Sequence, residues 1–237
     1  MQGIPSGGPV MRLVAEEKHF IAFHAIFSLI CAIVVFVPMA AMGTKVLGLV
    51  VLYNGALPLY GIVIKNSEWS RIWLFSFILS LFQVFPDWFL SAQLGILVFP
   101  DHGPWSIGTI AGYMAGLWTI PFFFIIFLAG RVRERSSTGM AYISAALTAL
   151  VIFGMSEAIA WQLPLWYARD VMMWGHTAVY IIIPEIILGL ACLYGYNSVK
   201  GRGLSATVPA AFLVMQLYLG SAAFFYFFLE KIVKLNH

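Results

Sequence analysis

Residues 140–160 read MAYISAALTALVIFGMSEAIA, an apolar run with a single charged residue, Glu157. A helix needs about 20 predominantly apolar residues to cross the hydrocarbon core of a bilayer. Lipid leaves backbone polar groups unsatisfied in any open structure, so that a helix is the expected form of such a run. The stretch therefore predicts a membrane-spanning helix that carries an acid at membrane depth.

Six further runs of the same character fill most of the remaining chain. Of the 237 residues, 62% are hydrophobic and only 10% are charged, whereas about 25% are charged in a typical soluble domain. The sequence predicts an all-α, polytopic transmembrane bundle with seven spans, at 20–42, 46–64, 72–99, 109–129, 140–160, 171–196 and 204–229. Residues 20–229 would then form one membrane domain between an N-terminal segment, 1–19, and a short tail, 230–237.

The distribution of Lys and Arg predicts the orientation of these spans. The N-terminus and the second, fourth and sixth connections share one side of the membrane and hold nine of the thirteen Lys and Arg residues. The other four are Lys45, Arg169, Lys231 and Lys234. The positive-inside rule thus predicts a multi-pass protein of the cell membrane with a cytoplasmic N-terminus and an extracytoplasmic C-terminus. A nucleic-acid partner is not expected, because the chain has no soluble basic face.

Three acids, Asp87, Glu157 and Glu185, lie inside the predicted spans, which hold no Lys or Arg to neutralise them. An acid at membrane depth is costly and marks a functional site by default. Burial disfavours the charged form of an unpaired carboxylic acid, so we expect Glu157 to hold a proton that it can donate and take back.

Depth along the spans brings two of these acids close to a histidine. With a rise of about 1.5 Å per residue, Asp87 lies about 24 Å and Glu157 about 27 Å from the cytoplasmic start of their spans. His176 lies about 9 Å from the outer end of the sixth span. All three are therefore predicted in the outer half of the bilayer, where they would line one polar pocket.

Residues four positions apart share a helix face, and this spacing supplies each group with a neighbour. The pairs are Gln83 with Asp87, Glu157 with Trp161, and His176 with Tyr180. Glu185 follows His176 by nine residues and is expected on another side of the sixth span, beside a kink at Pro184. The predicted site has catalytic residues Asp87, Glu157 and His176, and ligand-binding residues Gln83, Trp161, Tyr180, Glu185 and Gln216.

Each candidate also has a structural explanation. Asp87 follows Pro86 and would cap a helix that restarts after a break. Glu157 would be a protonated core carboxyl bonded to a backbone carbonyl, and His176 a hydrogen-bonded histidine near the membrane surface. The aromatic residues around Trp161 suit an interfacial belt.

The sequence predicts no cofactor and no metal site. Cys31 and Cys192 lie inside spans and are interpreted as apolar packing residues, and no zinc spacing or disulfide framework is present. Retinal proteins need a Lys midway along the last span, whereas Lys231 lies at its very end. Nucleophile-elbow, P-loop and dinucleotide-binding glycine patterns are also missing.

The leading hypothesis is a membrane enzyme that acts on a lipidic, isoprenoid-like substrate by proton transfer, in an isomerisation, cyclisation or hydration. Lipid can enter between helices, and aromatic walls suit an apolar chain or a developing cation. A proton- or cation-coupled transporter or channel would use the same acids as relay sites. A non-catalytic subunit of a membrane complex is the third hypothesis, and a homo-oligomer stays open. Membrane lipid and a lipidic or small-molecule substrate are the expected partners.

Overall fold

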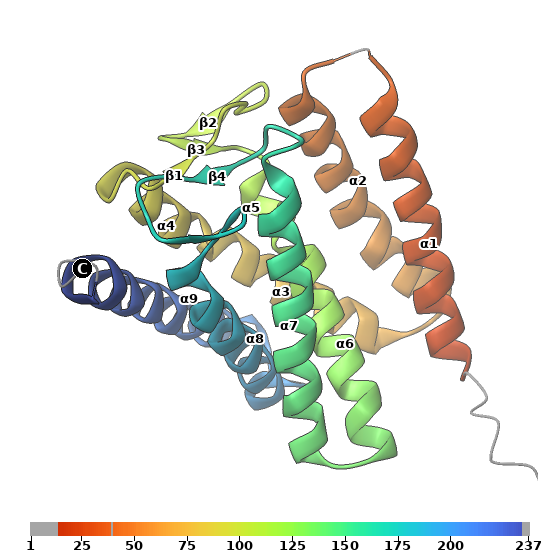
Figure 1. Ribbon diagram of the computed structural model, residues 1–237. Helices are drawn as coiled ribbons and strands as arrows, with labels where there is room; N and C mark the ends of the chain where they lie inside the picture. The colour runs from red at the N-terminus through yellow and green to blue at the C-terminus, as the bar shows by residue number, and fades with distance from the viewer. Residues whose placement is uncertain (1–13, 39, 234–237) are drawn as a thin grey trace, which may run out of the picture. The chain divides into compact units, whose positions relative to one another are not determined.

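The computed structural model describes residues 14–38 and 40–233. Within these residues, seven helices are long and apolar enough to cross a membrane (Figure 1). The predicted all-α bundle of seven spans is confirmed, and the chain is a multi-pass membrane protein. The first predicted segment, 1–19, lies largely outside the described residues, as does the end of the predicted tail, 234–237.

The spanning helices agree with the predicted runs to within a few residues, except at the third and sixth. Three spans are single helices near their predicted places: α1 (Ala15–Phe36), α2 (Met42–Val63) and α7 (Thr138–Ala160). The sixth span is also a single helix, α8 (Val179–Val199), but it begins at Val179 and not at residue 171. The other three spans each consist of several consecutive helices. The third is α3 (Ser67–Phe82), α4 (Val84–Trp88) and the π-helix η1 (Phe89–Gln93). The fourth is α5 (Met114–Leu117) and α6 (Thr119–Arg135), and the seventh is α9 (Leu204–Tyr226) and the π-helix η2 (Phe227–Val233).

The chain divides into two compact units, of which the first holds α1 and the second begins at Ala40 and holds the other six spans. The prediction of one domain over 20–229 stays a prediction. All the site residues described below belong to the second unit.

The third span passes through Pro86 without unwinding. Gln83 has helical backbone angles, and its carbonyl oxygen accepts a hydrogen bond from the Asp87 amide at 3.2 Å. Pro86 has no amide hydrogen to donate, and the helix widens into the π-turns of η1 just beyond it. Such local widening is frequent at functional sites. The continuous helix keeps Gln83 and Asp87 on one face.

The second unit has three short antiparallel strand pairs. Two of them, β1–β4 and β2–β3, are labelled in Figure 1, where they lie at one end of its helices. Their bounds are β1 (Leu97–Val98) with β4 (Tyr167–Ala168), β2 (Ser106–Ile107) with β3 (Ile110–Ala111), and β5 (Met173–Trp174) with β6 (Thr177–Ala178). The predicted sixth span began at residue 171, but residues 173–178 form the β5–β6 hairpin around Gly175, at φ +62°. The strands thus replace the predicted outer ends of the third and sixth spans.

The helix α8 is the most deeply buried span of the second unit. It packs against α7, α9 and α6. A Cβ added at Gly189 would come within 2.4 Å of the Ala149 Cβ on α7, so that glycine permits the close contact of these two helices. Because α8 is central, its one acid, Glu185, faces the protein interior at 4% exposure.

Candidate functional site

A cavity of about 240 Å³ lies in the second unit, beside the strand pair β1–β4. Three of its lining residues are carboxylic acids, each from a different span: Asp87 from α4, Glu157 from α7 and Glu185 from α8. No Lys or Arg lines it. Most of the remaining wall is apolar or aromatic, including Leu90, Leu97, Phe99, Met114, Leu117, Ile120, Ile152, Ile181 and Ala178.

Asp87 is held by an indole from the facing helix. Its side chain is 2% exposed, and Oδ2 accepts a hydrogen bond from Trp118 Nε1 at 3.1 Å. Trp118 lies at the junction of α5 and α6. An indole N–H can only donate, so this contact fixes the carboxyl group against the start of the fourth span without supplying a charge.

Glu157 has a similar partner. Its Oε1 accepts a hydrogen bond from Trp166 Nε1 at 2.8 Å. Trp166 lies in the segment that follows α7 and directly precedes β4, and it also lines the cavity. The second acid is therefore tied to the segment between α7 and β4.

Glu185 has no hydrogen-bond partner among the described residues, although it is almost fully buried and lines the cavity. Glu185 was expected on another side of the sixth span than His176, and it lines the cavity while His176 is exposed outside it. That expectation counted helical turns from His176, but α8 begins only at Val179, and helical periodicity does not extend back into the hairpin. An unpartnered buried carboxyl group is costly, and here it points into a cavity that a ligand can fill.

Aromatic rings form one wall beside Asp87. The Trp118 ring lies 5.3 Å from Phe153 and 6.0 Å from Tyr218, measured between ring centroids. All three rings line the cavity, as does Tyr180, which is 3% exposed. The negative faces of aromatic rings attract cations, so this wall suits a positive charge that develops next to a carboxyl group.

His176 does not belong to the cavity, which corrects the predicted convergence. It is exposed and stacks on Trp161, with ring centroids 4.1 Å apart. Trp161 itself is 43% exposed, and its indole donates to the carbonyl of Ala158. The hairpin places the imidazole outside the bundle, where the depth estimate had assumed a helix.

The two predicted glutamines also lie away from the cavity wall. Gln216 is exposed on α9. Gln83 is fully buried, and neither its amide nitrogen nor its carbonyl oxygen has a hydrogen-bond partner among the described residues. Gln83 precedes Asp87 by one helical turn, so its amide lies behind the site.

Sequence reasoning did not select Trp118, Trp166 or Tyr218 as site residues. A signal was available for Trp118, because an indole in the middle of an apolar run needs an acceptor for its N–H. The nearest acceptor type in the neighbouring spans is a carboxyl group. Trp166 was assigned to an aromatic belt, and nothing in the sequence links Tyr218 to the third span.

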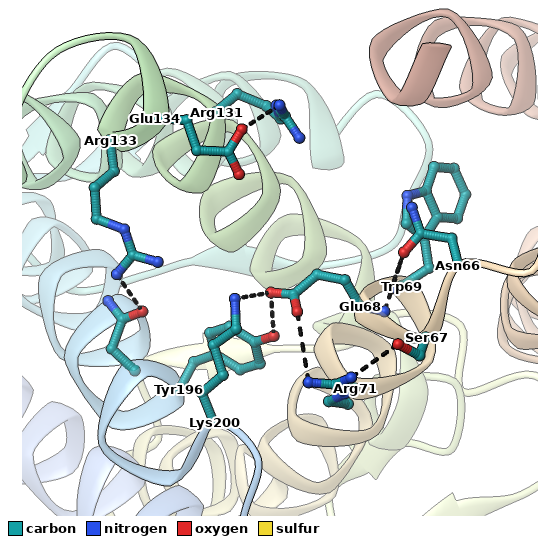
Figure 2. Close-up of polar contacts among 11 residues, drawn as sticks. Asn66, Ser67, Glu68, Trp69, Arg71, Arg131, Arg133, Glu134, Tyr196 and Lys200 are labelled. Atoms are coloured by element: carbon teal, nitrogen blue, oxygen red, sulfur yellow. Dashed lines mark hydrogen bonds and ion pairs between the residues drawn. The ribbon is translucent and has the colours of Figure 1, made fainter. Parts of the chain in front are cut away.

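A second polar cluster closes the opposite end of the bundle (Figure 2). At its centre, Glu68 accepts hydrogen bonds from Lys200 Nζ at 2.6 Å and from the Tyr196 hydroxyl at 2.7 Å. Arg133 donates to Asn197 at 3.0 Å nearby. These contacts join the end of α8 to the start of α3 and to the end of α6. The cluster, called the clamp below, therefore holds these three helices together.

The helix α3 is packed with large apolar side chains between this clamp and the cavity. Trp69, Ile72 and Phe75 are each at most 2% exposed, and the Trp69 ring contacts Phe123 and Phe127 of α6. The cavity therefore lies at the strand-covered end and is separated from the clamp by a packed layer.

The residues that the structure describes include no group of three His, Cys, Asp or Glu side chains able to hold a metal ion. Neither the curated proteins nor the solved structures contain a match to this chain. Residues 84–229 match the family described as "Domain of unknown function (DUF6989)". This segment includes all three cavity acids together with Trp118, Trp166 and Tyr218. By this match over more than half of its length, the chain belongs to the DUF6989 family.

Proposed function

We propose that the cavity binds an apolar, isoprenoid-like chain from the membrane and that its carboxyl groups transfer protons to and from a carbon–carbon double bond. One observation carries the proposal: three acids from three helices converge on a largely apolar cavity that no Lys or Arg lines. Three carboxylates cannot all be ionised at low cost in such surroundings. At least one acid therefore holds a proton in the resting protein.

Asp87 is the candidate proton donor, because its carboxyl group touches Trp118 and the aromatic wall. Its O–H bond breaks, a C–H bond forms, and the electron pair of the double bond leaves the neighbouring carbon with a positive charge. The faces of Trp118, Phe153 and Tyr218 stabilise that charge. The carboxylate left on Asp87 lies close enough to attract it.

Glu185 is the candidate base, since it lines the cavity and none of the described residues forms a hydrogen bond with its carboxyl oxygens. It removes a proton from the carbon next to the cation, and a double bond forms in a new position. The net reaction is an isomerisation that needs no other reactant. Glu157, bonded to Trp166, is the second candidate acid or the group that returns the proton to Asp87.

A transporter is the rival function, and the packing around Trp69, Ile72 and Phe75 argues against it. A coupled transporter needs an ion path that reaches both sides of the membrane, whereas this layer has no polar gap. By the count of Lys and Arg, the cavity belongs to the extracytoplasmic half of a cell-membrane protein.

Deuterium incorporation tests the proposed function without knowledge of the product. Proteoliposomes of the full chain are incubated in D2O with squalene or geranylgeraniol, and the lipids are analysed by mass spectrometry. Reversible protonation of a double bond leaves a stable C–D bond. We expect incorporation with the wild type and with Gln216→Leu, and its loss in Asp87→Asn and Glu185→Gln.

Incorporation that persists in both acid variants would contradict the proposal. A pH-sensitive dye inside the same proteoliposomes reports the rival function directly. Proton uptake that depends on Asp87, without deuterium in either lipid, would favour a transporter. A wild type that shows neither signal, but co-purifies with a stable membrane partner, would favour a subunit of a complex.

A further inference from the structure

The helices α3 and α6 pack antiparallel, and two contacts fix their register. Ser80 Oγ of α3 donates to the carbonyl of Ala115, one turn before α6, at 3.2 Å. Nearer the other end, the Trp69 ring lies 5.9 Å from the Phe127 ring. One turn before Ser80 on α3 lies Ser76, and one turn after Ala115, at the start of α6, lies Thr119. These two residues therefore face one another across the helix interface.

Both of these side chains are fully buried, and neither hydroxyl has a hydrogen-bond partner in the part of the chain that the structure describes. Gln83, two turns beyond Ser76, is also fully buried, and neither its amide nitrogen nor its amide oxygen has a hydrogen-bond partner among the described residues. A buried polar group without a partner is costly, because it has given up its hydrogen bonds to water without replacement. Three such residues along one interface therefore indicate ligands that satisfy them, and buried polar groups are commonly satisfied by ordered water.

The unsatisfied groups lie on the same face of α3 as Asp87. At about 100° per residue, Ser76, Ser80, Gln83 and Asp87 fall within an arc of about 60°. From Ser76 to Asp87 the face extends about 16 Å along the helix axis. Beyond Ser76 the polar face stops at Ile72, which is 2% exposed. The polar face is thus closed at one end and reaches a site acid at the other.

We propose that Ser76, Thr119 and Gln83 hold a short row of bound water molecules between α3 and α6, and that this row ends at Asp87. Hydroxyl and amide groups both donate and accept, so each water can find the two to four polar partners that it needs. The water site itself does not depend on any reaction. Its role does rest on the proposed function: the row solvates the carboxylate that remains when Asp87 has given up its proton, while an apolar ligand fills the cavity.

Hydroxyl-radical footprinting by X-ray radiolysis of the full chain in detergent tests the water row. Radicals form from water in place, so a buried ring next to bound water is oxidised. The probe is Phe123, one turn from Thr119 on α6, and the internal control is Phe75, a ring of the same type on α3 that packs against Tyr196 of α8; they are 0% and 1% exposed. We expect Phe123 to be oxidised several-fold more than Phe75, and a several-fold loss of this excess in Ser76→Ala/Thr119→Val.

Equal oxidation of Phe123 and Phe75 in the wild type would overturn the proposal, as would an excess that the double variant retains. The wild-type comparison alone decides the matter if the variant does not fold. Melting temperatures give a second measurement through Thr119→Val, matched by Thr207→Val, which removes a hydroxyl that donates to Gly203. Both changes lower the melting temperature if water binds Thr119, whereas Thr119→Val raises it if that hydroxyl is dry and unpaired.

The deuterium experiment tests the proposed function and the footprinting tests the water row, so either can fail without the other. Without deuterium incorporation, an oxidised Phe123 would still establish the water site and remove only its proposed role. Without the excess at Phe123, deuteration would establish the chemistry and refute the water row.

Discussion

Among the described residues, Trp118 donates the one hydrogen bond to the Asp87 side chain, at 3.1 Å, and Trp118→Phe removes it while keeping an aromatic ring beside Phe153. Loss of a buried hydrogen bond costs about 1–3 kcal/mol when its partner is left unsatisfied. The smaller ring adds the cost of a partly filled cavity. We therefore expect Trp118→Phe to lower the free energy of unfolding by about 2–4 kcal/mol.

A double-mutant cycle with Asp87→Leu, whose side chain has no atom to accept the indole N–H, separates these two contributions. Unfolding is followed by circular dichroism in mixed micelles with increasing SDS. The coupling energy between the two positions should be about 0.5–3 kcal/mol. It reports the hydrogen bond between them, because each single change removes that same bond. The control is Trp161→Phe, whose indole donates to the Ala158 carbonyl on the surface and not to a site acid. A coupling energy indistinguishable from zero between Trp118 and Asp87 would refute the described contact.

Three further predictions address the fold around the site. Burial, together with the nearby Asp101 charge, raises the pKa of Tyr113. The stability that its protonated form contributes is complete below about pH 10 and is lost as the pH rises toward the pKa of the folded state. Tyr113→Phe should therefore weaken the loss of stability above pH 10 in SDS unfolding, and an unchanged dependence of stability on pH would contradict this. Gly189→Leu should prevent stable assembly of α7 and α8, because an added Cβ already lies 2.4 Å from Ala149 Cβ; a variant with wild-type melting behaviour would show that the helices can separate. A reporter fused after His237 should be active only outside the cytoplasm if the Lys and Arg count is right; activity inside would reverse the orientation.

The spans could be predicted because a bilayer imposes a length and a composition on every helix that crosses it. Asp87, Glu157 and Glu185 could be selected because an acid is conspicuous where all else is apolar. Each of the three lines the cavity. Their common chemical role stays a prediction.

The errors around the sixth span have one cause. Residues 171–178 are apolar enough to extend a spanning helix, yet they form a hairpin with Gly175 at φ +62°. Helical counting across this hairpin placed His176 inside the bundle, whereas the structure leaves it exposed outside the cavity. Hydropathy does not separate a spanning helix from an apolar hairpin that covers the end of one, because both bury the same kind of side chain.

The partners of the acids could not be predicted for a different reason. Contacts such as Trp118 with Asp87 join residues 31 positions apart, and they depend on which helices are neighbours. Periodicity fixes the face of a helix but not the helix that it meets. Trp166 adds a loop residue to the site, and its position depends on β4 pairing with β1.

A high-resolution structure of the protein purified with its native lipids tests the central claim most directly. We predict an elongated apolar ligand in the cavity, with an unsaturated segment between Asp87 and Glu185 and against the Trp118 ring. A continuous file of water that crosses the bilayer past Ile72 and Trp69 would contradict the enzyme proposal in favour of a transporter. A cavity filled by the protein's own side chains, with Glu185 bonded to a partner subunit, would contradict both.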